Sequence, residues 1–249
     1  MRIVFLTTDD PIYLPAFFER VLGRWTTETV AVYVVPPLYR HQTRRAAAWR
    51  YYRTFGATAT VALARRILEA HLRRQSVSSC CERYGVPCAR AADVNTREFV
   101  GQLAALRPDL VVSVSCPQIF KRELIEIPVR GCLNVHGAIL PNYRGVMPSF
   151  WMLANGETQA GVTVHFVDER VDAGELCGQA FFDIAPDETL DGFLQRSKRI
   201  AAELLVDVLA RVESGTVERR QIDLTHGSYY SWPNRDAVKR FAAAGRRLW

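Results

Sequence analysis

The stretch NVHGAILPNYRG at residues 134–145 closes an apolar segment and leads into a turn. Gly131–His136 is expected to be a strand, and side chains two residues apart on a strand share a face. Asn134 and His136 are therefore expected to point together into one pocket where the strand ends. An imidazole can move a proton near neutral pH, and an amide can donate to a developing oxyanion. The stretch thus predicts a catalytic pair.

Two further motifs follow in order: GVTVH at residues 161–165 and VDAG at residues 171–174. The series Asn-x-His, Leu-Pro-x-Tyr-Arg-Gly, Gly-Val-Thr and Asp-x-Gly resembles the folate-dependent formyltransferases. The resemblance is tightest over Asp109–Leu176 and looser over most of Met1–Gly215. It implies an α/β fold, with a Rossmann-like, mostly parallel sheet flanked by helices and a site at the C-terminal ends of the strands. One position departs from the family pattern, because Ala138 stands where these enzymes usually have serine.

The remaining pattern agrees with this fold. Apolar runs and helical spacing alternate, which is typical of parallel βαβ units. Strands are expected at Arg2–Leu6, Thr29–Val35, Val86–Ala89, Leu110–Ser115 and Gly131–His136, and Val162–Val167 with Leu176–Ile184 is expected to form a hairpin. Helices are expected at residues 12–23, Ser76–Tyr84, Thr96–Leu106, Leu190–Val212 and Arg235–Trp249.

We divide the chain into a catalytic domain at residues 1–217 and a C-terminal extension at residues 218–249. Residues 38–74 interrupt the βα rhythm with nine arginines and the aromatics Tyr39, Trp49, Tyr51, Tyr52 and Phe55. They are expected to form one or two inserted helices. A solvated amphipathic insertion is the simpler interpretation, and a basic, aromatic face for nucleic acid or a nucleotide is the alternative. The extension is expected to pack on the main domain as a strap.

Composition narrows the class of protein. The chain has 249 residues, 49% of them apolar, and a formal net charge of +6. It has no apolar run of the ~20 residues that cross a bilayer, and its N-terminus does not resemble a signal peptide. A cytoplasmic protein without a membrane partner is expected. The six cysteines form no paired CxxC pattern, so no metal is expected.

The resemblance assigns roles to particular residues. It implies Asn134, His136 and Asp172 as catalytic, with Asp172 pairing with His136 and raising its pKa. The residues implied for folate binding are Gln118, Ile119, Phe120, Leu140, Val167 and Val171. Candidates for binding the acceptor are Tyr143, Arg144, Tyr229 and Trp232. His165 is interpreted as a structural residue of its strand.

The implied function is formyl transfer from 10-formyltetrahydrofolate to an amine, as part of one-carbon metabolism. A small-molecule acceptor, such as an amino sugar on a nucleotide, is the first hypothesis, because the ~30 residues after Glu218 are too few for a second domain that binds transfer RNA. The alternatives are methionyl-tRNA formyltransferase-like activity, formyltetrahydrofolate hydrolysis, or a non-catalytic relative that binds folate or a nucleotide. The first strand ends in Asp9 and Asp10 instead of glycines, which disfavours glycinamide ribonucleotide. The sequence does not indicate an oligomeric state.

Overall fold

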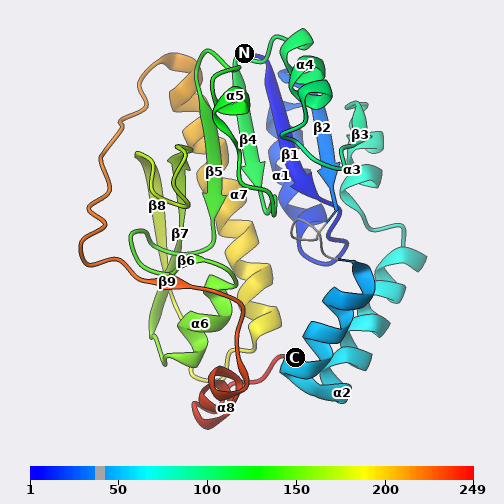
Figure 1. Cartoon of the computed structure of the whole chain (residues 1–249), viewed down its shortest axis with the longest axis vertical. Coiled ribbons are helices and arrows are strands. Elements are labelled where there is room, and N and C mark those ends of the chain that lie inside the picture. Colours follow the sequence, from blue (N-terminus) through cyan, green and yellow to red (C-terminus); the bar gives the residue numbers. More distant parts are fainter. Residues whose placement is uncertain (37–42) are drawn as a thin grey trace.

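The computed structural model describes residues 1–36 and 43–249 (Figure 1). Within these residues, one sheet has the strand order β3-β2-β1-β4-β5-β7-β8. Its strands are β1 Ile3–Thr8, β2 Thr29–Val35, β3 Cys88–Arg90, β4 Leu110–Val114, β5 Cys132–His136, β7 Gln159–Phe166 and β8 Leu176–Asp183. The helices are α1 Leu14–Trp25, α2 Arg44–Leu72, α3 Val77–Arg83, α4 Arg97–Ala105, α5 Arg122–Ile125, α6 Pro148–Ala154, α7 Leu190–Ser214 and α8 Arg235–Ala243.

The sheet is parallel from β3 to β5 and antiparallel from β5 to β8. This arrangement confirms the predicted α/β fold class and the predicted hairpin. A parallel sheet needs cover on both faces, which explains why β1 and β4 are buried along their whole length. The chain therefore forms three layers, with α1 and α7 behind the sheet and α4 and α5 in front of it (Figure 1).

Alternation along β1 divides the core between the two faces of the sheet. Ile3 and Phe5 lie in a cluster with buried residues of α1, α3 and α7. Val4 and Leu6 lie in a second cluster with α4 and α5. In sheets of this kind, ligand sites lie at the C-terminal ends of the strands, where the connecting loops can carry polar side chains.

Helix boundaries depart from the sequence prediction where local capping decides them. The first helix was predicted at residues 12–23, but the Asp10 carboxylate accepts hydrogen bonds from the N–H groups of Ile12 (2.7 Å) and Tyr13 (3.1 Å). These bonds form a turn, and α1 begins only at Leu14. The last helix was predicted to reach Trp249, but α8 ends at Ala243, and Gly245 has a positive φ of +71°. The short helices α5 and α6 were not predicted.

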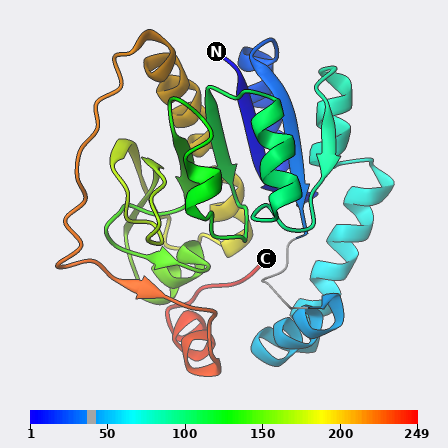
Figure 2. The ribbon, with the colours of Figure 1, turned by 45° about the horizontal axis from the view of Figure 1, so that its top comes forward.

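The inserted segment is α2, which consists of two helical parts joined by a kink at Gly56, where φ is +85° and ψ is 176°. The prediction of one or two helices is confirmed over Arg44–Leu72. The start of the predicted insertion, including Tyr39, lies outside the described residues. In Figure 2, α2 stands beside the sheet, away from the layers that sandwich it.

The C-terminal segment crosses the molecule before it ends. After α7 it runs in an arc along the β8 side, and then β9, Tyr229–Tyr230, pairs in parallel with β6, Arg144–Gly145 (Figure 2). Ala237 and Phe241 of α8 are buried with Phe150 of α6 in a third apolar cluster. The segment thus reaches the loop after β5, which carries the candidate site. In the described part of the chain, every helix is too short or too polar to cross a bilayer.

Candidate active site

The register between β5 and β7 brings three polar side chains together at the edge of the sheet. Asn134 and His136 lie on one face of β5, and Asn134 is directly opposite His165 on β7. Directly opposed side chains on antiparallel strands are about 5 Å apart, which is within contact range. The amide nitrogen of Asn134 lies 3.2 Å from Nε2 of His165.

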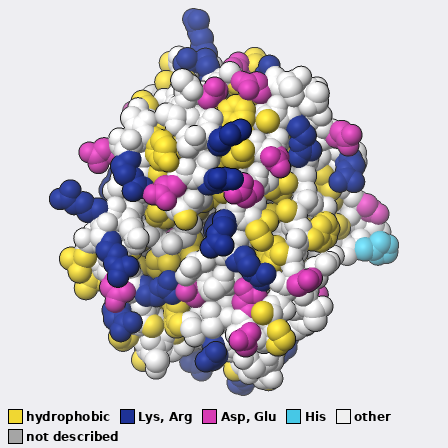
Figure 3. All heavy atoms as spheres, turned by 180° about the vertical axis from the view of Figure 1, so that it is seen from behind, with side chains coloured by type: hydrophobic (Ala, Val, Ile, Leu, Met, Phe, Trp, Pro, Cys, Tyr) yellow, Lys and Arg dark blue, Asp and Glu magenta, His cyan; other side chains and the backbone are white. Residues whose placement is uncertain are grey.

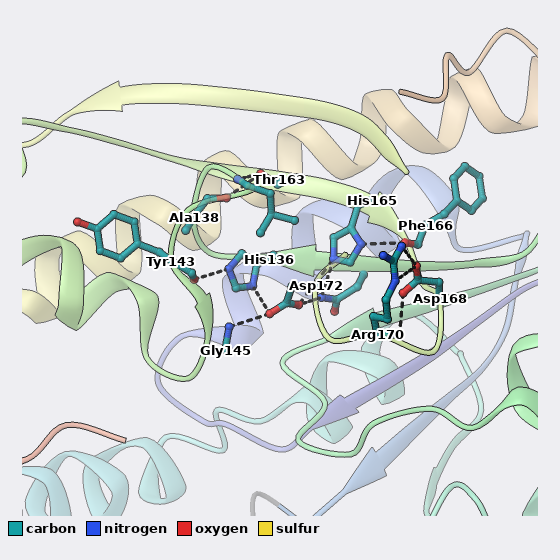
Figure 4. A network of polar contacts seen from close by, with 12 residues as sticks. His136, Ala138, Tyr143, Gly145, Thr163, His165, Phe166, Asp168, Arg170 and Asp172 are labelled. Atoms are coloured by element: carbon teal, nitrogen blue, oxygen red, sulfur yellow. Dashed lines mark hydrogen bonds and ion pairs between the residues drawn. The ribbon is translucent and has the colours of Figure 1, made fainter. Parts of the chain in front are cut away.

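Asp172 joins these residues from the loop between β7 and β8 (Figure 4). Its Oδ2 lies 3.6 Å from Nδ1 of His136 and accepts a 2.9 Å hydrogen bond from the N–H of Gly145. Its Oδ1 accepts from Nδ2 of Asn134 at 3.3 Å and lies 3.8 Å from Nε2 of His165. One carboxylate therefore contacts two strands and the loop after β5.

Two glycines of the motifs let the backbone approach this closely. Gly145 has φ +93°, and a Cβ there would clash with the carbonyl oxygen of Tyr230. Gly174, of the Asp-x-Gly motif, lies against the carbonyl oxygen of Phe166, so a Cβ there would also clash. Only glycine has neither the Cβ nor its conformational limits. This close approach of the backbone thus explains why the Tyr-Arg-Gly and Asp-x-Gly motifs both end in glycine.

The buried carboxylate of Asp172 is held in its ionised form. Burial alone raises its pKa, but the positive charge of protonated His136 and the hydrogen bond from the N–H of Gly145 outweigh that effect and hold the pKa at about 2. The residue also has a left-handed backbone, with φ +49°. A non-glycine residue in that region is uncommon and is found where the surrounding contacts determine the conformation.

Burial dominates the ionisation of His136. It lowers the pKa of the imidazole, while Asp172 and the carbonyl oxygen of Tyr143 oppose that effect. Asp172 does raise the pKa of His136, as expected. The pKa nevertheless lies below its ordinary value, because the effect of burial is larger. Nε2 lies 2.9 Å from that carbonyl oxygen, so Nε2 carries the proton of the neutral ring. Nδ1, which faces Asp172, then has the lone pair.

The amide of Asn134 has its hydrogens directed at neighbours within the site. Nδ1 of His165 lies 2.8 Å from the carbonyl oxygen of Phe166 and must donate to it, which leaves Nε2 of His165 as an acceptor. Nδ2 of Asn134 therefore donates both to His165 and to Asp172. Asn134 thus orients two other residues in addition to facing the cavity.

A cavity of about 630 Å³ opens onto these side chains. Asn134, His136 and Asp172 all line it, together with the loop after β4, the loop before β8 and one face of α7. Among the residues implied for folate binding, the ones that line it are Gln118, Ile119, Phe120, Val167 and Val171. Of the acceptor candidates, Tyr229 and Trp232 line it as well.

Three candidates lie outside the cavity lining. Leu140 is buried, and its N–H donates to Oγ1 of Thr163. Tyr143 contacts His136 through its backbone carbonyl, while its ring stacks on Tyr230 with 5.2 Å between centroids. Arg144 belongs to β6, and its N–H donates to the carbonyl oxygen of Ser228. Their positions fit a supporting role better than ligand contact.

Sequence reasoning missed two polar residues of the cavity. His165 was interpreted as structural, because an apolar, alternating strand does not distinguish a core histidine from one beside a site. Lys198 projects from α7, and its Nζ donates to Oγ of Ser115 at 2.7 Å. Burial lowers the pKa of Lys198, and Asp10 opposes this shift. The helical spacing of α7 had no feature that marked Lys198 as a cavity residue.

Ala138 does not lie in the cavity lining. Its side chain is buried in the cluster around Phe150, and its carbonyl oxygen accepts from Oγ1 of Thr163 at 2.7 Å. The missing family hydroxyl therefore lies behind the site. Among the described residues, no group of three or more His, Cys, Asp or Glu is placed to hold a metal ion.

Known proteins resemble this chain in sequence. The family model for formyl transferases matches residues 1–209. A methionyl-tRNA formyltransferase of Trichlorobacter lovleyi is 36% identical over 158 residues, covering 64% of this chain and 50% of that protein. The chain spans about half the length of such relatives, since it also covers only 47% of the Geobacter metallireducens protein.

Solved structures share the fold at low identity. A sugar N-formyltransferase from Shewanella sp. FDAARGOS_354 has a TM-score of 0.62 at 19% identity, covering 93% of this chain and 76% of that one. An N-formyltransferase from Helicobacter canadensis, solved with folinic acid and dTDP-3-aminofucose, has a TM-score of 0.58 at 16% identity, covering 93% and 71%.

The pair of His136 and Asp172 predicts how the histidine titrates. Burial penalises the imidazolium, so the NMR midpoint of His136 should lie below its ordinary value of 6.5. The negative charge of Asp172 favours the imidazolium, so Asp172→Asn should lower the midpoint further. Asp168→Asn is the matched control, because Asp168 lies in the same loop and pairs with Arg170 at 2.8 Å. An upward shift in Asp172→Asn would contradict this electrostatic assignment.

Proposed function

This chain belongs to the formyl transferase family, and we propose that it transfers a formyl group from 10-formyltetrahydrofolate to the amine of a small molecule. The observation that carries the proposal is the buried Asp172 carboxylate, which contacts both Asn134 and His136 beside one cavity. An acyl transfer needs a group that moves a proton and a donor that faces the carbonyl oxygen. These two residues have those properties.

The cavity walls fit a folate. Ile119, Phe120, Val167 and Val171 form an apolar side, which suits a flat pterin ring. Ile119 is 63% exposed and lines the cavity, so its side chain is accessible to a ligand there. When bound, the folate supplies the activated formyl group. The backbone from Val167 to Asp172 is available to hydrogen-bond its polar edge.

We assign the proton transfer to Nδ1 of His136. As the acceptor nitrogen bonds to the formyl carbon, it loses a proton to this lone pair. The imidazolium then donates toward Asp172 and toward the carbonyl oxygen of Tyr143, which both accept. The same proton passes to the departing nitrogen when its bond to the formyl carbon breaks. Low dielectric around the buried pair strengthens the stabilisation by Asp172.

The amide of Asn134 is assigned to the formyl oxygen. Its hydrogens are directed at Asp172 and His165 at 3.3 and 3.2 Å, both at the long end of hydrogen-bond range. Catalytic hydrogen bonds are often long or misaligned before substrate binds. One hydrogen turns to the oxygen as negative charge develops there, and His165 and Asp172 hold the amide in place.

A nucleotide-linked amino sugar is the acceptor that we favour. Tyr229 and Trp232 provide aromatic walls, and Lys198 provides an amino group in the same cavity. The structural relative from Helicobacter canadensis was solved with a ligand of this kind. Aminoacyl-tRNA is the second candidate, because the Trichlorobacter lovleyi relative is a methionyl-tRNA formyltransferase.

Replacing His136 tests the assigned proton transfer. His136→Ala should lower kcat by about 100- to 10,000-fold, the usual contribution of a general acid-base group. His71→Ala is the matched control, because His71 is exposed on α2 and should retain the parental rate. Both variants are checked by circular dichroism. A folded His136→Ala variant with parental formyl transfer would rule out the assignment.

A second prediction concerns the folate wall. Ile119→Asp should weaken binding of folinic acid about tenfold or more, because a charge then lies against the apolar ring. Val129→Asp makes the same change at a side chain that is 84% exposed and does not line the cavity, so it should bind normally. Isothermal titration calorimetry measures both. Equal affinities for the two variants would place the folate elsewhere.

The two acceptor classes are separated by direct competition at physiological salt. Formylation of a nucleoside-diphosphate amino sugar should be faster than formylation of charged initiator transfer RNA. RNA attracted only by the arginines of α2 should bind weakly and lose affinity steeply as salt rises. Mass spectrometry identifies the product. Faster turnover of the transfer RNA would overturn the acceptor assignment and leave the formyl-transfer chemistry in place.

A further inference from the structure

A second cavity, of about 390 Å³, lies between α2 and the N-terminal end of α8. Its lining includes three arginines, Arg50, Arg53 and Arg235, with Trp49, Thr54 and Asn234. We refer to it as the arginine cleft. It is separate from the catalytic cavity, and the formyl-transfer mechanism does not use it.

The arginine cleft carries concentrated positive charge. From Arg45 to Leu68, α2 has no acidic residue. Arg66 pairs with Asp191 (2.6 Å) and Arg65 with Glu69 (3.2 Å), so these two lie in ion pairs away from the cleft. In the part of the chain that the structure describes, Arg53 and Arg235 belong to no ion pair. Elsewhere, on the face seen from behind, basic and acidic side chains are interspersed (Figure 3).

The N-terminus of α8 adds to this charge. Asn234 caps the helix, with its Oδ1 accepting from the N–H of Ala237 at 2.8 Å, and Arg235 is the first helical residue. A helix N-terminus carries partial positive charge and favours anions. Together with the guanidinium groups, it makes the arginine cleft complementary to phosphate, which arginine binds through paired hydrogen bonds.

An aromatic pair stands at the rim of the arginine cleft. Trp49 and Tyr52 stack with 5.3 Å between ring centroids and 22° between ring planes, and Trp49 is 60% exposed. Exposed aromatic rings beside basic groups are typical of sites that stack a nucleic-acid base. A ligand with both a base and phosphates matches this combination.

Trp232 connects the arginine cleft to the catalytic cavity. It lines the catalytic cavity, and its indole N–H donates to Oγ1 of Thr54 at 3.0 Å. The guanidinium of Arg50 lies over the same ring, 4.1 Å from its centroid. Arg50 and Thr54 line the arginine cleft, so Trp232 lines one cavity and contacts two residues that line the other.

We infer that the arginine cleft binds the phosphates of the acceptor, with the base stacked on Trp49 and the amine placed beyond Trp232. This inference rests on the proposed function and specifies its acceptor as a nucleoside diphosphate carrying an amine. The positive charge matches the phosphates, the aromatic rim matches the base, and Trp232, which contacts both cavities, matches the link to the amine.

Calorimetry with two probes tests the arginine cleft directly. Thymidine 5′-diphosphate and inorganic pyrophosphate should both bind the parent protein, and Arg53→Gln or Arg235→Gln should weaken each about tenfold by removing a charged phosphate contact. Trp49→Ala should weaken only the nucleotide, by about fivefold. Arg45→Gln removes an equal charge from α2 outside the cleft and should bind like the parent.

The outcomes separate this inference from the proposed function. If the parent transfers formyl groups but the arginine variants bind both probes like the parent, the inference fails alone. If the probes bind through the arginines but no formyl transfer occurs, the proposed function fails and the nucleotide site stands. Tighter binding of the RNA trinucleotide CCA than of thymidine 5′-diphosphate would also overturn the inference. Unchanged folinic acid affinity verifies that each variant is folded.

Discussion

The carboxylate of Asp172 is the constraint on which the site depends. A charge that is largely buried must be compensated, because an isolated carboxylate in a low-dielectric interior costs several kcal/mol. Here Nδ2 of Asn134, which His165 holds in place, and the N–H of Gly145 donate to the carboxylate, and His136 adds a positive charge when it is protonated. Satisfying one charge therefore positions β5, β7 and the loop after β5 together. Displacing any one segment would leave the carboxylate partly uncompensated.

The sheet provides the edge at which this compensation is possible. The apolar clusters cover the two faces of the sheet, so the loops at the C-terminal ends of the strands can carry polar side chains without disturbing the core. The C-terminal segment then closes the edge, with β9 pairing on β6 and α8 packing on α6. Trp232 lies in that segment and contacts α2. Two parts of the chain that stand outside the βα pattern thus meet beside the cavity that Asn134, His136 and Asp172 line.

Whether a feature could be predicted from the sequence depends on the interactions that produce it. The strands β1 and β4 were predictable because a buried parallel strand needs an unbroken apolar run. The helix α6 was not, since six of its seven residues are buried and its sequence has no amphipathic period. Within the site, Asn134, His136 and Asp172 were found from ordered motifs. His165 and Lys198 were not identified as cavity residues, because their positions depend on strand register and on the side of α7 that faces the cavity.

The sequence by itself determined the fold class, the strands of the main sheet and the longer helices, and the pairing of Asn134 with His136 on one face, because these depend on local periodicity and composition. Tertiary structure decided the rest. It set the neutral form of His136 through burial, made Asn134 an orienting group through His165, and placed Leu140 and Arg144 outside the cavity lining. These properties depend on desolvation and on distances between residues far apart in the chain, which no local pattern encodes.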